Sequence, residues 1–197
     1  MASRLFQAYS SALTRRPLLT QSITAASLYA AGDVIAQGVS TSAHIEKSKW
    51  DWERTLRMTT IGGLALGPTM AVWYRLLQRR IQLSTHTRSV LARVLADQAI
   101  FAPGSIVGLY YLTELLQPST GTIQDRLSAA QQNVQSSFTQ VLLRNYTLWP
   151  AVSFLNFFYV PLQYRLLVSN TVAIFWSAYL SFAVNRVEPG EQGFRQP

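Results

Sequence analysis

Residues 166–185, LLVSNTVAIFWSAYLSFAVN, form an apolar stretch that contains no charged side chain. As an α-helix, a stretch of this length rises about 30 Å, which is the thickness of the hydrocarbon core of a bilayer. An amphipathic helix on the surface of a soluble protein would instead carry charged residues along its solvent-exposed face. The stretch therefore predicts a helix that crosses a membrane.

Four more stretches lack charged residues in the same way and approach the length that a spanning helix needs. They are residues 17–32, 58–74, 98–113 and 145–164. We predict spanning helices at about residues 17–39, 55–77, 90–116 and 162–185. The expected fold is all-α: residues 1–197 form a single integral-membrane domain, a multi-pass transmembrane helical bundle of about four spans.

The segment 124–160 is less regular than the predicted spans. Its first half is polar and helix-forming, which suits a helix at the membrane interface or a cap on the bundle. Its second half, LWPAVSFLNFFYVP, is apolar but contains Pro150 and Pro161, and proline interrupts helices. Two interpretations stay open: residues 145–185 form one long kinked crossing, or a half-inserted segment precedes a separate span.

The overall composition agrees with a membrane protein but does not require one. Charged residues make up 13% of the chain, roughly half the share in an ordinary soluble domain. The mean hydropathy of +0.12 is low for a membrane protein, so a soluble helical bundle remains an alternative. The net charge of +8 comes from basic residues between long apolar segments. These suit membrane-flanking positions, so we expect no direct nucleic-acid binding.

Basic residues gather on one predicted face of the membrane. The N-terminal segment and the region 75–93 contain arginines but no acidic residue, whereas residues 46–54, on the other face, carry both signs of charge. The positive-inside tendency makes the N-terminal face the cytosolic or matrix-like one. Residues 1–16 are also basic, acid-free and amphipathic, as in a mitochondrial address, although a plain interfacial helix has the same properties.

The residues needed for common enzyme chemistry are missing. The chain has no cysteine, and His44 and His86, its two histidines, do not have the spacing of a metal site. No phosphate-binding loop, dinucleotide fingerprint or nucleophile elbow occurs. We therefore expect no catalytic residue, no metal site and no cofactor.

Polar residues within the predicted spans are the candidates for function, because a charged group inside a bilayer requires a partner or a hydrated cavity. One hypothesis is that they line a water-filled path; the other is that Asp33 and Asp97 pair with arginines on neighbouring helices. The candidates are Asp33, Gln37, Asp97, Gln98, Asn156, Arg165 and Asn170.

Small residues and prolines suggest how the helices pack. Two G-x-x-x-G motifs, Gly63 with Gly67 and Gly104 with Gly108, predict close helix contacts. Pro68 and Pro103 lie beside these motifs and are expected to kink their helices.

A pattern of residues along most of the chain resembles a known family. Its C-terminal part runs from Trp149-Pro150 to a Tyr-Leu-Ser triplet at 179–181; earlier parts include Gly32-Asp33, Gly67-Pro68, Trp73-Tyr74 and Asp97-Gln98. With these residues the chain resembles the Mpv-seventeen family, which includes the twenty-two-kilodalton peroxisomal membrane protein. It is most similar to the fungal, stress-inducible mitochondrial branch. It departs from the common family pattern at Ala71, Tyr146 and Ser153.

The resemblance implies a four-span protein of the mitochondrial inner membrane, with the peroxisomal membrane as the alternative. Members are linked to mitochondrial DNA maintenance, ethanol metabolism and stress tolerance, and are proposed to form channels. The leading hypothesis is therefore a channel-like conduit for small metabolites or ions. The alternative is a structural membrane protein that stabilises inner-membrane complexes without transport. Expected partners are the lipid bilayer and either further copies of the chain or an inner-membrane complex.

Overall fold

The computed structural model describes residues 2–42, 50–117 and 121–185, and in these ranges it is all-helical, without a strand. The helices form six continuous rods. They are α1 (Ala2–Arg15); α2 (Pro17–Ser42); α3 (Trp52–Thr60), η1 (Ile61–Leu66) and α4 (Gly67–Arg80); α5 (His86–Ala96), η2 (Asp97–Phe101) and α6 (Ala102–Leu115); α7 (Ile123–Tyr159); and η3 (Leu162–Tyr164) with α8 (Arg165–Asn185). The predicted all-α fold is confirmed.

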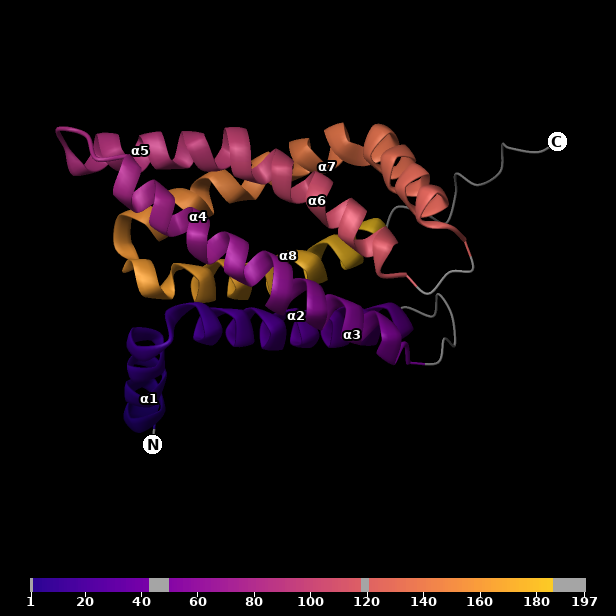
Figure 1. The fold of residues 1–197 in the computed structure, drawn as a ribbon, viewed down its shortest axis with the longest axis horizontal. Coiled ribbons are helices and arrows are strands. Elements are labelled where there is room, and N and C mark those ends of the chain that lie inside the picture. Colours follow the sequence, from indigo (N-terminus) through magenta and orange to yellow (C-terminus); the bar gives the residue numbers. More distant parts are fainter. Residues whose placement is uncertain (1, 43–49, 118–120, 186–197) are drawn as a thin grey trace.

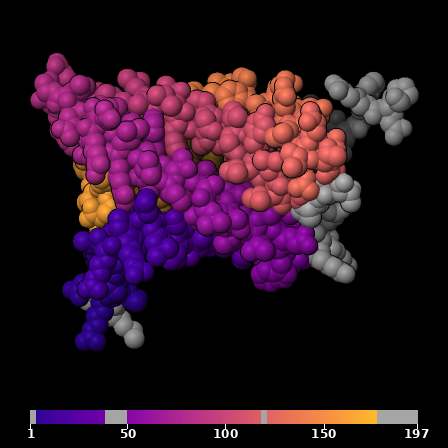
Figure 2. All heavy atoms as spheres, viewed as in Figure 1, coloured from indigo at the N-terminus to yellow at the C-terminus, as the bar shows by residue number. Residues whose placement is uncertain are grey.

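Five of the rods run back and forth as a bundle, and α1 stands across the end of α2 (Figure 1). In the space-filling view α1 projects from the body of the molecule (Figure 2). The basic end of α4 and the start of α5 lie at the same end of the bundle as α1 (Figure 1). This agrees with the predicted clustering of arginines on one face. Residues 46, 47 and 49, which belong to the opposite face in that prediction, lie outside the described residues.

Side-chain caps set where three of the helices begin. Asp51 accepts a hydrogen bond from the Arg54 amide at the start of α3, and Thr85 does the same for the Arg88 amide of α5. Thr122 and Asp125 form a reciprocal capping box at the start of α7. There the hydrogen bond from the Thr122 hydroxyl lowers the pKa of Asp125. These caps satisfy amides that a helix start otherwise leaves unpaired.

Pro68 and Pro103 follow turns of π-helix, and neither proline ends its rod. The Gly67 amide bonds to the Gly62 carbonyl and the Ala102 amide bonds to the Asp97 carbonyl, each five residues back. Proline has no amide hydrogen, so the carbonyl four residues before it loses its helical partner and the preceding turn widens. The disturbance expected from each proline therefore takes the form of a wider turn just before it: η1 before Pro68 and η2 before Pro103.

The segment predicted to be broken is one continuous helix. α7 runs for 37 residues with Pro150 inside it, and the chain reverses only after Tyr159. One missing hydrogen bond does not end a helix that packs along much of its length, whereas Pro161 follows the last turn and prevents its continuation. Residues 145–185 are thus two helices joined by a turn, and their interpretation as a single kinked crossing is wrong.

Glycines bring η1 against α2. A Cβ atom at Gly63 would lie 2.9 Å from the Ala26 Cβ, and one at Gly67 would lie 2.9 Å from the Ala25 Cβ. The first G-x-x-x-G motif therefore makes the predicted close contact. At Gly104 and Gly108 a Cβ would meet no atom within 4 Å. The second motif makes no such contact within the described chain, because its face points away from the neighbouring helices.

One rod in the described part of the chain, His86–Leu115, is both long enough and apolar enough to cross a membrane. Only 22% of its apolar window is buried. The core helix of a soluble protein would be mostly buried, so this exposure favours contact with lipid. Exposed apolar side chains also occur on other rods, among them Leu64, which is 79% exposed. The number of four spans stays a prediction.

The tight contact at Gly67 can be tested with the substitution Gly67→Leu. We expect it to destabilise the protein by about 1–3 kcal/mol, because the larger side chain would displace α2 from η1. The matched control is Gly104→Leu, which adds the same atoms where space is open. Thermal unfolding in detergent measures both, and equal melting temperatures for the two variants would contradict the close packing of η1 on α2.

Candidate functional site

A cavity of about 250 Å³ lies inside the bundle, and we call it the central cavity. Every rod except α1 contributes to the wall of this cavity. The rod made of α3, η1 and α4 does so through η1 and α4. Its polar lining includes Tyr29 from α2, Tyr74 from α4, Asp97 and Gln98 from η2, Asn145 from α7 and Asn170 from α8. Residues far apart in the sequence thus surround one space.

A second hollow, the side cavity, adjoins the first. It has a volume of about 260 Å³, and Asp33 and Arg54 contribute its charged groups. Tyr29 and Asn170 line both hollows, as do two small or aliphatic neighbours, Leu109 and Ala173. The two cavities therefore meet at a junction formed by α2, α6 and α8.

Asp97 is buried in the wall of the central cavity, and all the hydrogen-bond donors around it are neutral. Its Oδ1 accepts from the Trp73 indole nitrogen at 2.9 Å. Its Oδ2 accepts from the Ser153 hydroxyl at 2.8 Å and from the Gln98 amide at 3.1 Å. The predicted pairing of Asp97 with an arginine is not what the structure shows. Arg93, one turn earlier, instead donates to the Ile81 carbonyl at 2.8 and 3.2 Å.

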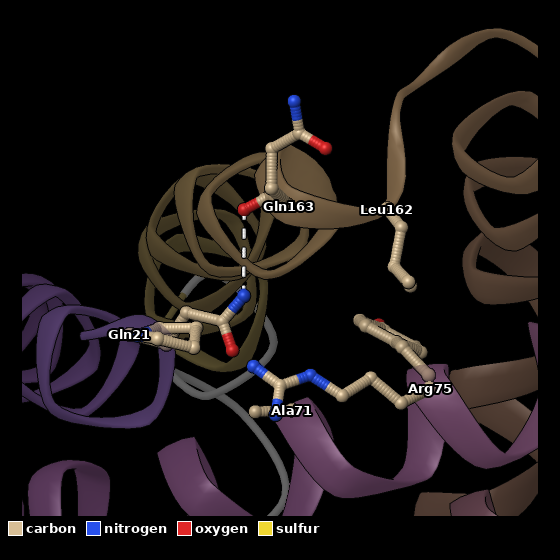
Figure 3. A pocket seen from close by; sticks show the side chains of 7 residues that line it. Gln21, Ala71, Arg75, Leu162 and Gln163 are labelled. Carbon is tan, nitrogen blue, oxygen red and sulfur yellow. Dashed lines mark hydrogen bonds between the residues drawn. The ribbon is translucent and has the colours of Figure 1, made fainter. Parts of the chain in front are cut away.

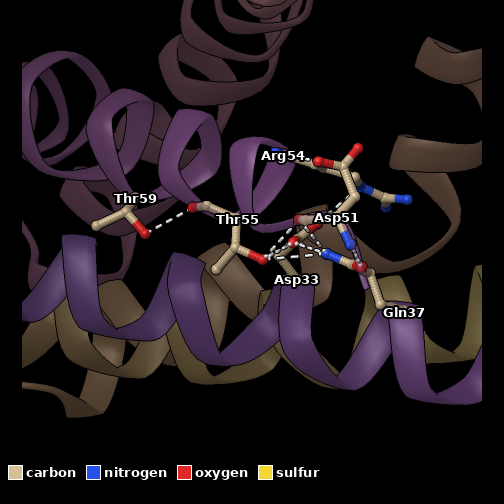
Figure 4. A network of polar contacts seen from close by, with 6 residues as sticks. All are labelled: Asp33, Gln37, Asp51, Arg54, Thr55 and Thr59. Carbon is tan, nitrogen blue, oxygen red and sulfur yellow. Dashed lines mark hydrogen bonds and ion pairs between the residues drawn. The ribbon is translucent and has the colours of Figure 1, made fainter. Parts of the chain in front are cut away.

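Asp33 does have the arginine partner that was predicted as one alternative. Its Oδ1 lies 2.8 Å from the Arg54 Nε, and its side chain is 3% exposed while that of Arg54 is 45% exposed. Its Oδ2 accepts hydrogen bonds from Gln37 and from Thr55, both at 2.7 Å. Figure 4 shows these side chains converging between α2 and the start of α3. The network fixes the α3 helix to α2.

Gln37 extends this network to the helix cap. Its Nε2 donates to the Asp51 carbonyl at 3.0 Å, and its Oε1 accepts from the Asp51 amide at 2.9 Å (Figure 4). Because Asp51 is also the N-cap of α3, Gln37 holds the backbone of the residue that starts this helix. Its contacts are those of a positioning residue, and it lines neither of the two cavities.

Asn156 and Arg165 lie at the turn between α7 and α8, away from both cavities. Arg165 donates to the Val160 and Phe157 carbonyls at 3.0 and 3.2 Å and to the Gln78 side chain at 3.0 Å. Asn156 donates to the Arg165 carbonyl at 3.0 Å. The Arg165 bonds satisfy carbonyls that the end of α7 leaves free, and the Asn156 bond ties α7 to the start of α8. The two residues therefore close the α7–α8 hairpin.

Three buried polar atoms beside the central cavity have no hydrogen-bond partner among the described residues. They are the Oε1 of Gln98, the Oδ1 of Asn145 and the Nδ2 of Asn170. Asn170 is 3% exposed and stands at the junction of the two cavities. An unsatisfied buried polar atom costs roughly 1–3 kcal/mol, so these groups are suited to binding a polar molecule that enters the cavity.

Several residues of the site could not be recognised from their position in the sequence. Trp73 and Ser153 both bond to Asp97, although they lie 24 and 56 positions from it. Tyr146 donates to the Gln98 carbonyl at 2.9 Å. Tyr146 and Ser153 are two of the positions at which the chain departs from the common family pattern. Both departures thus contact the same Asp97-Gln98 pair. The departures from the family pattern were therefore the signal in the sequence that could have identified these two residues as part of the site.

An all-helical bundle with buried polar groups around internal cavities and an apolar outer surface has the arrangement of a multi-helix membrane protein. A model of the Mpv17 / PMP22 family matches residues 121–181. Protein SYM1 of Gibberella zeae is 38% identical over 175 residues, 88% of this chain and 94% of that protein. Mitochondrial inner membrane protein Mpv17 of Bos taurus is 38% identical over 186 residues, 93% of this chain and 99% of that protein. The chain belongs to the Mpv17 / PMP22 family.

The relatives also agree on a location. The protein of Drosophila melanogaster that is named mitochondrial inner membrane protein Mpv17 is 34% identical over 168 residues, 85% of this chain and 95% of that protein. The mitochondrial inner membrane, predicted from the sequence, is confirmed as the location. No solved structure matches the chain.

The ion pair of the side cavity can be tested with a double-mutant cycle of Asp33→Asn and Arg54→Gln. We expect a coupling free energy of about 1 kcal/mol, because Arg54 is half exposed and solvent weakens the attraction. Chemical unfolding of the four proteins in detergent measures it. Arg57→Gln, one turn along the same rod, is the charge-matched control. Additive effects of the two substitutions would show that the pair contributes no interaction energy.

Proposed function

We propose that the protein is a channel-like conduit of the inner membrane whose path runs through the central and side cavities. The observation that carries this proposal is the junction at Asn170, where two internal hollows meet beside polar groups that the chain leaves unsatisfied. Polar groups inside a bundle that faces lipid are costly, and they commonly mark a path for ions or solutes. Small metabolites or ions are the proposed transported species.

The seven predicted lining residues divide into two groups by position. Asp97, Gln98 and Asn170 line the central cavity, and Asp33 with Asn170 lines the side cavity. In the proposal these four contact the solute. Gln37, Asn156 and Arg165 hold α3 and the α7–α8 hairpin in place, and so shape the path without lining it. No covalent step is part of the proposal.

Tyr74 extends the possible path toward the basic end of the bundle. It lines the central cavity and also a small pocket between α2, α4 and η3. Its hydroxyl lies 2.9 Å from that of Ser169, and its ring packs edge-on against Phe157. Movement of this one buried side chain would connect the central cavity with the small pocket. The hollows are thus arranged along the bundle, as a route across a membrane requires.

A structural role without transport is the second candidate, and the Asp33 network favours it. Both Asp33 oxygens have partners within the chain, so this carboxylate needs no solute. In that case the protein would stabilise an inner-membrane complex, or oligomers of itself, through its apolar surface. The family resemblance sets the same physiological context for either role: stress response, ethanol metabolism and mitochondrial DNA maintenance.

Conductance in planar bilayers tests the conduit with the substitution Asn170→Leu. We expect the larger apolar side chain to reduce the single-channel conductance strongly, because it would fill the junction of the two cavities. Thr171→Leu is the matched control, since Thr171 is the next residue of α8 and is exposed.

Asp97→Asn should change the ratio of cation to anion permeability while retaining the side-chain volume. A reconstituted protein without conductance, together with normal cell growth of Asp33→Ala and Asp97→Ala, would exclude the conduit.

The structural alternative predicts a different result for a charge swap. If Asp33→Arg and Arg54→Asp together restore stability and growth on ethanol medium, while no flux is measured at any stage, the polar residues only hold helices together. Flux that depends on Asn170 would contradict this alternative.

A further inference from the structure

A small pocket lies at the basic end of the bundle, about 18 Å along α2 from Asp33 by helical rise. We call it the end pocket, and its volume is about 90 Å³. Its lining comes from three elements (Figure 3): Pro17 and Gln21 of α2, Ala71 and Arg75 of α4, and Leu162 and Gln163 of η3, together with Tyr74. The elements come from the start, middle and end of the chain, so the pocket forms only in the folded bundle.

Arg75 supplies an uncompensated positive charge to this pocket. Its guanidinium extends across the pocket toward the side chain of Gln21 (Figure 3). No hydrogen bond or ion pair joins the Arg75 side chain to another described residue, and no acidic residue lines the pocket. Arginine presents a planar set of donors that fits a carboxylate or a phosphate. The missing partner is therefore an anionic group.

Gln21 is a second polar group that the fold leaves incompletely satisfied. It is 5% exposed, and its Oε1 has no hydrogen-bond partner within the part of the chain that the structure describes. Its Nε2 donates to the Gln163 carbonyl at 3.4 Å, which is long for a hydrogen bond (Figure 3). The free oxygen only accepts and would repel an anion, so binding requires this weakly held amide to turn and present its NH₂ group to a ligand beside Arg75. A buried amide and a guanidinium thus face the same small space.

The surroundings of the end pocket favour an anion. No acidic residue occurs before Asp33, between Glu53 and Asp97, or between Asp125 and Glu188, and these ranges supply all of the pocket's lining. The first turn of α2 begins at Pro17, so the positive end of its helix dipole points to the pocket. Arg79 and Arg80 follow one turn after Arg75 on α4.

The size of the end pocket limits what it can hold. Pockets that enclose whole organic ligands have volumes of roughly 300–1,000 Å³, which is several times larger. A volume of about 90 Å³ instead suits a single charged group. Basic pockets between membrane helices on the matrix side commonly bind lipid headgroups through their phosphates.

We propose that the end pocket binds a phosphate group, with Arg75 as the bidentate donor and Gln21 as the second donor. The phosphate belongs either to an acidic phospholipid or to free inorganic phosphate, since the chemistry of recognition is the same. The site can be tested apart from the conduit, because binding is measured without flux and through Arg75 and Gln21, which line neither the central nor the side cavity.

The test uses the full-length protein in micelles of dodecyl maltoside, a detergent that contains no phosphate. One series receives inorganic phosphate, followed by ³¹P NMR, and the other contains phosphatidylglycerol, followed by native mass spectrometry. Arg75→Gln is expected to weaken binding about tenfold or more, because it removes a charge that forms hydrogen bonds with the phosphate. The matched control Arg80→Gln removes one charge from the same end, at an exposed position outside the pocket, and is expected to weaken binding much less.

The two series distinguish the sources of the phosphate. Saturable binding in the lipid series alone assigns a phospholipid headgroup, and saturable binding of inorganic phosphate in the phosphate-free micelles assigns free phosphate. Equal losses in the two variants, or no saturable binding in either series, would overturn the proposal. Gln21→Glu provides a second variant, because its carboxylate would occupy Arg75. Wild-type binding by this variant would also overturn the proposal.

Discussion

The buried carboxylates of this bundle need partners inside it, because much of its outer surface is apolar and offers none. Asp33 and Asp97 meet this constraint differently. Asp33 has a half-exposed arginine and two neutral donors, and its bonds join α2 to α3. Asp97 has only neutral donors, which come from α4, α7 and its own η2. The two carboxylates therefore connect most of the rods, and the cavities lie between them.

The two π turns carry a close helix contact and part of the polar wall of the central cavity. η2 starts at Asp97, and its wider turn ends directly before Ala102 and Pro103. η1 occupies the equivalent position before Pro68, where Gly62, Gly63 and Gly67 let it approach α2. The prolines remove the amides that would close these turns regularly. The turn before Pro68 thus makes the close contact with α2, and the turn before Pro103 supplies Asp97 and Gln98 to the cavity wall.

The prediction from sequence succeeded where a single residue type decides the outcome and failed where the outcome depends on tertiary neighbours. Charge-free stretches predicted helices because that property is local, whereas the G-x-x-x-G spacing predicted a close contact correctly at Gly63–Gly67 but not at Gly104–Gly108. The partner of Asp97 could not be predicted, since Trp73 and Ser153 reach it only through the packing of α4 and α7. Pro150 was overvalued as a helix breaker, because the rest of α7 continues the helix on both sides.

The central cavity itself is informative about function because of what it costs. The central cavity has a volume of about 250 Å³, and the side chains that line such a space lose the packing contacts that a filled interior would give them. Larger side chains at Ala102 or Ala173, both of which line the cavity, would fill part of it. A bundle that served only to hold its own helices together would gain stability from such replacements. The small residues and the unsatisfied amide of Asn170 instead preserve a polar space between the helices, which favours a role for that space in binding or passage of solutes.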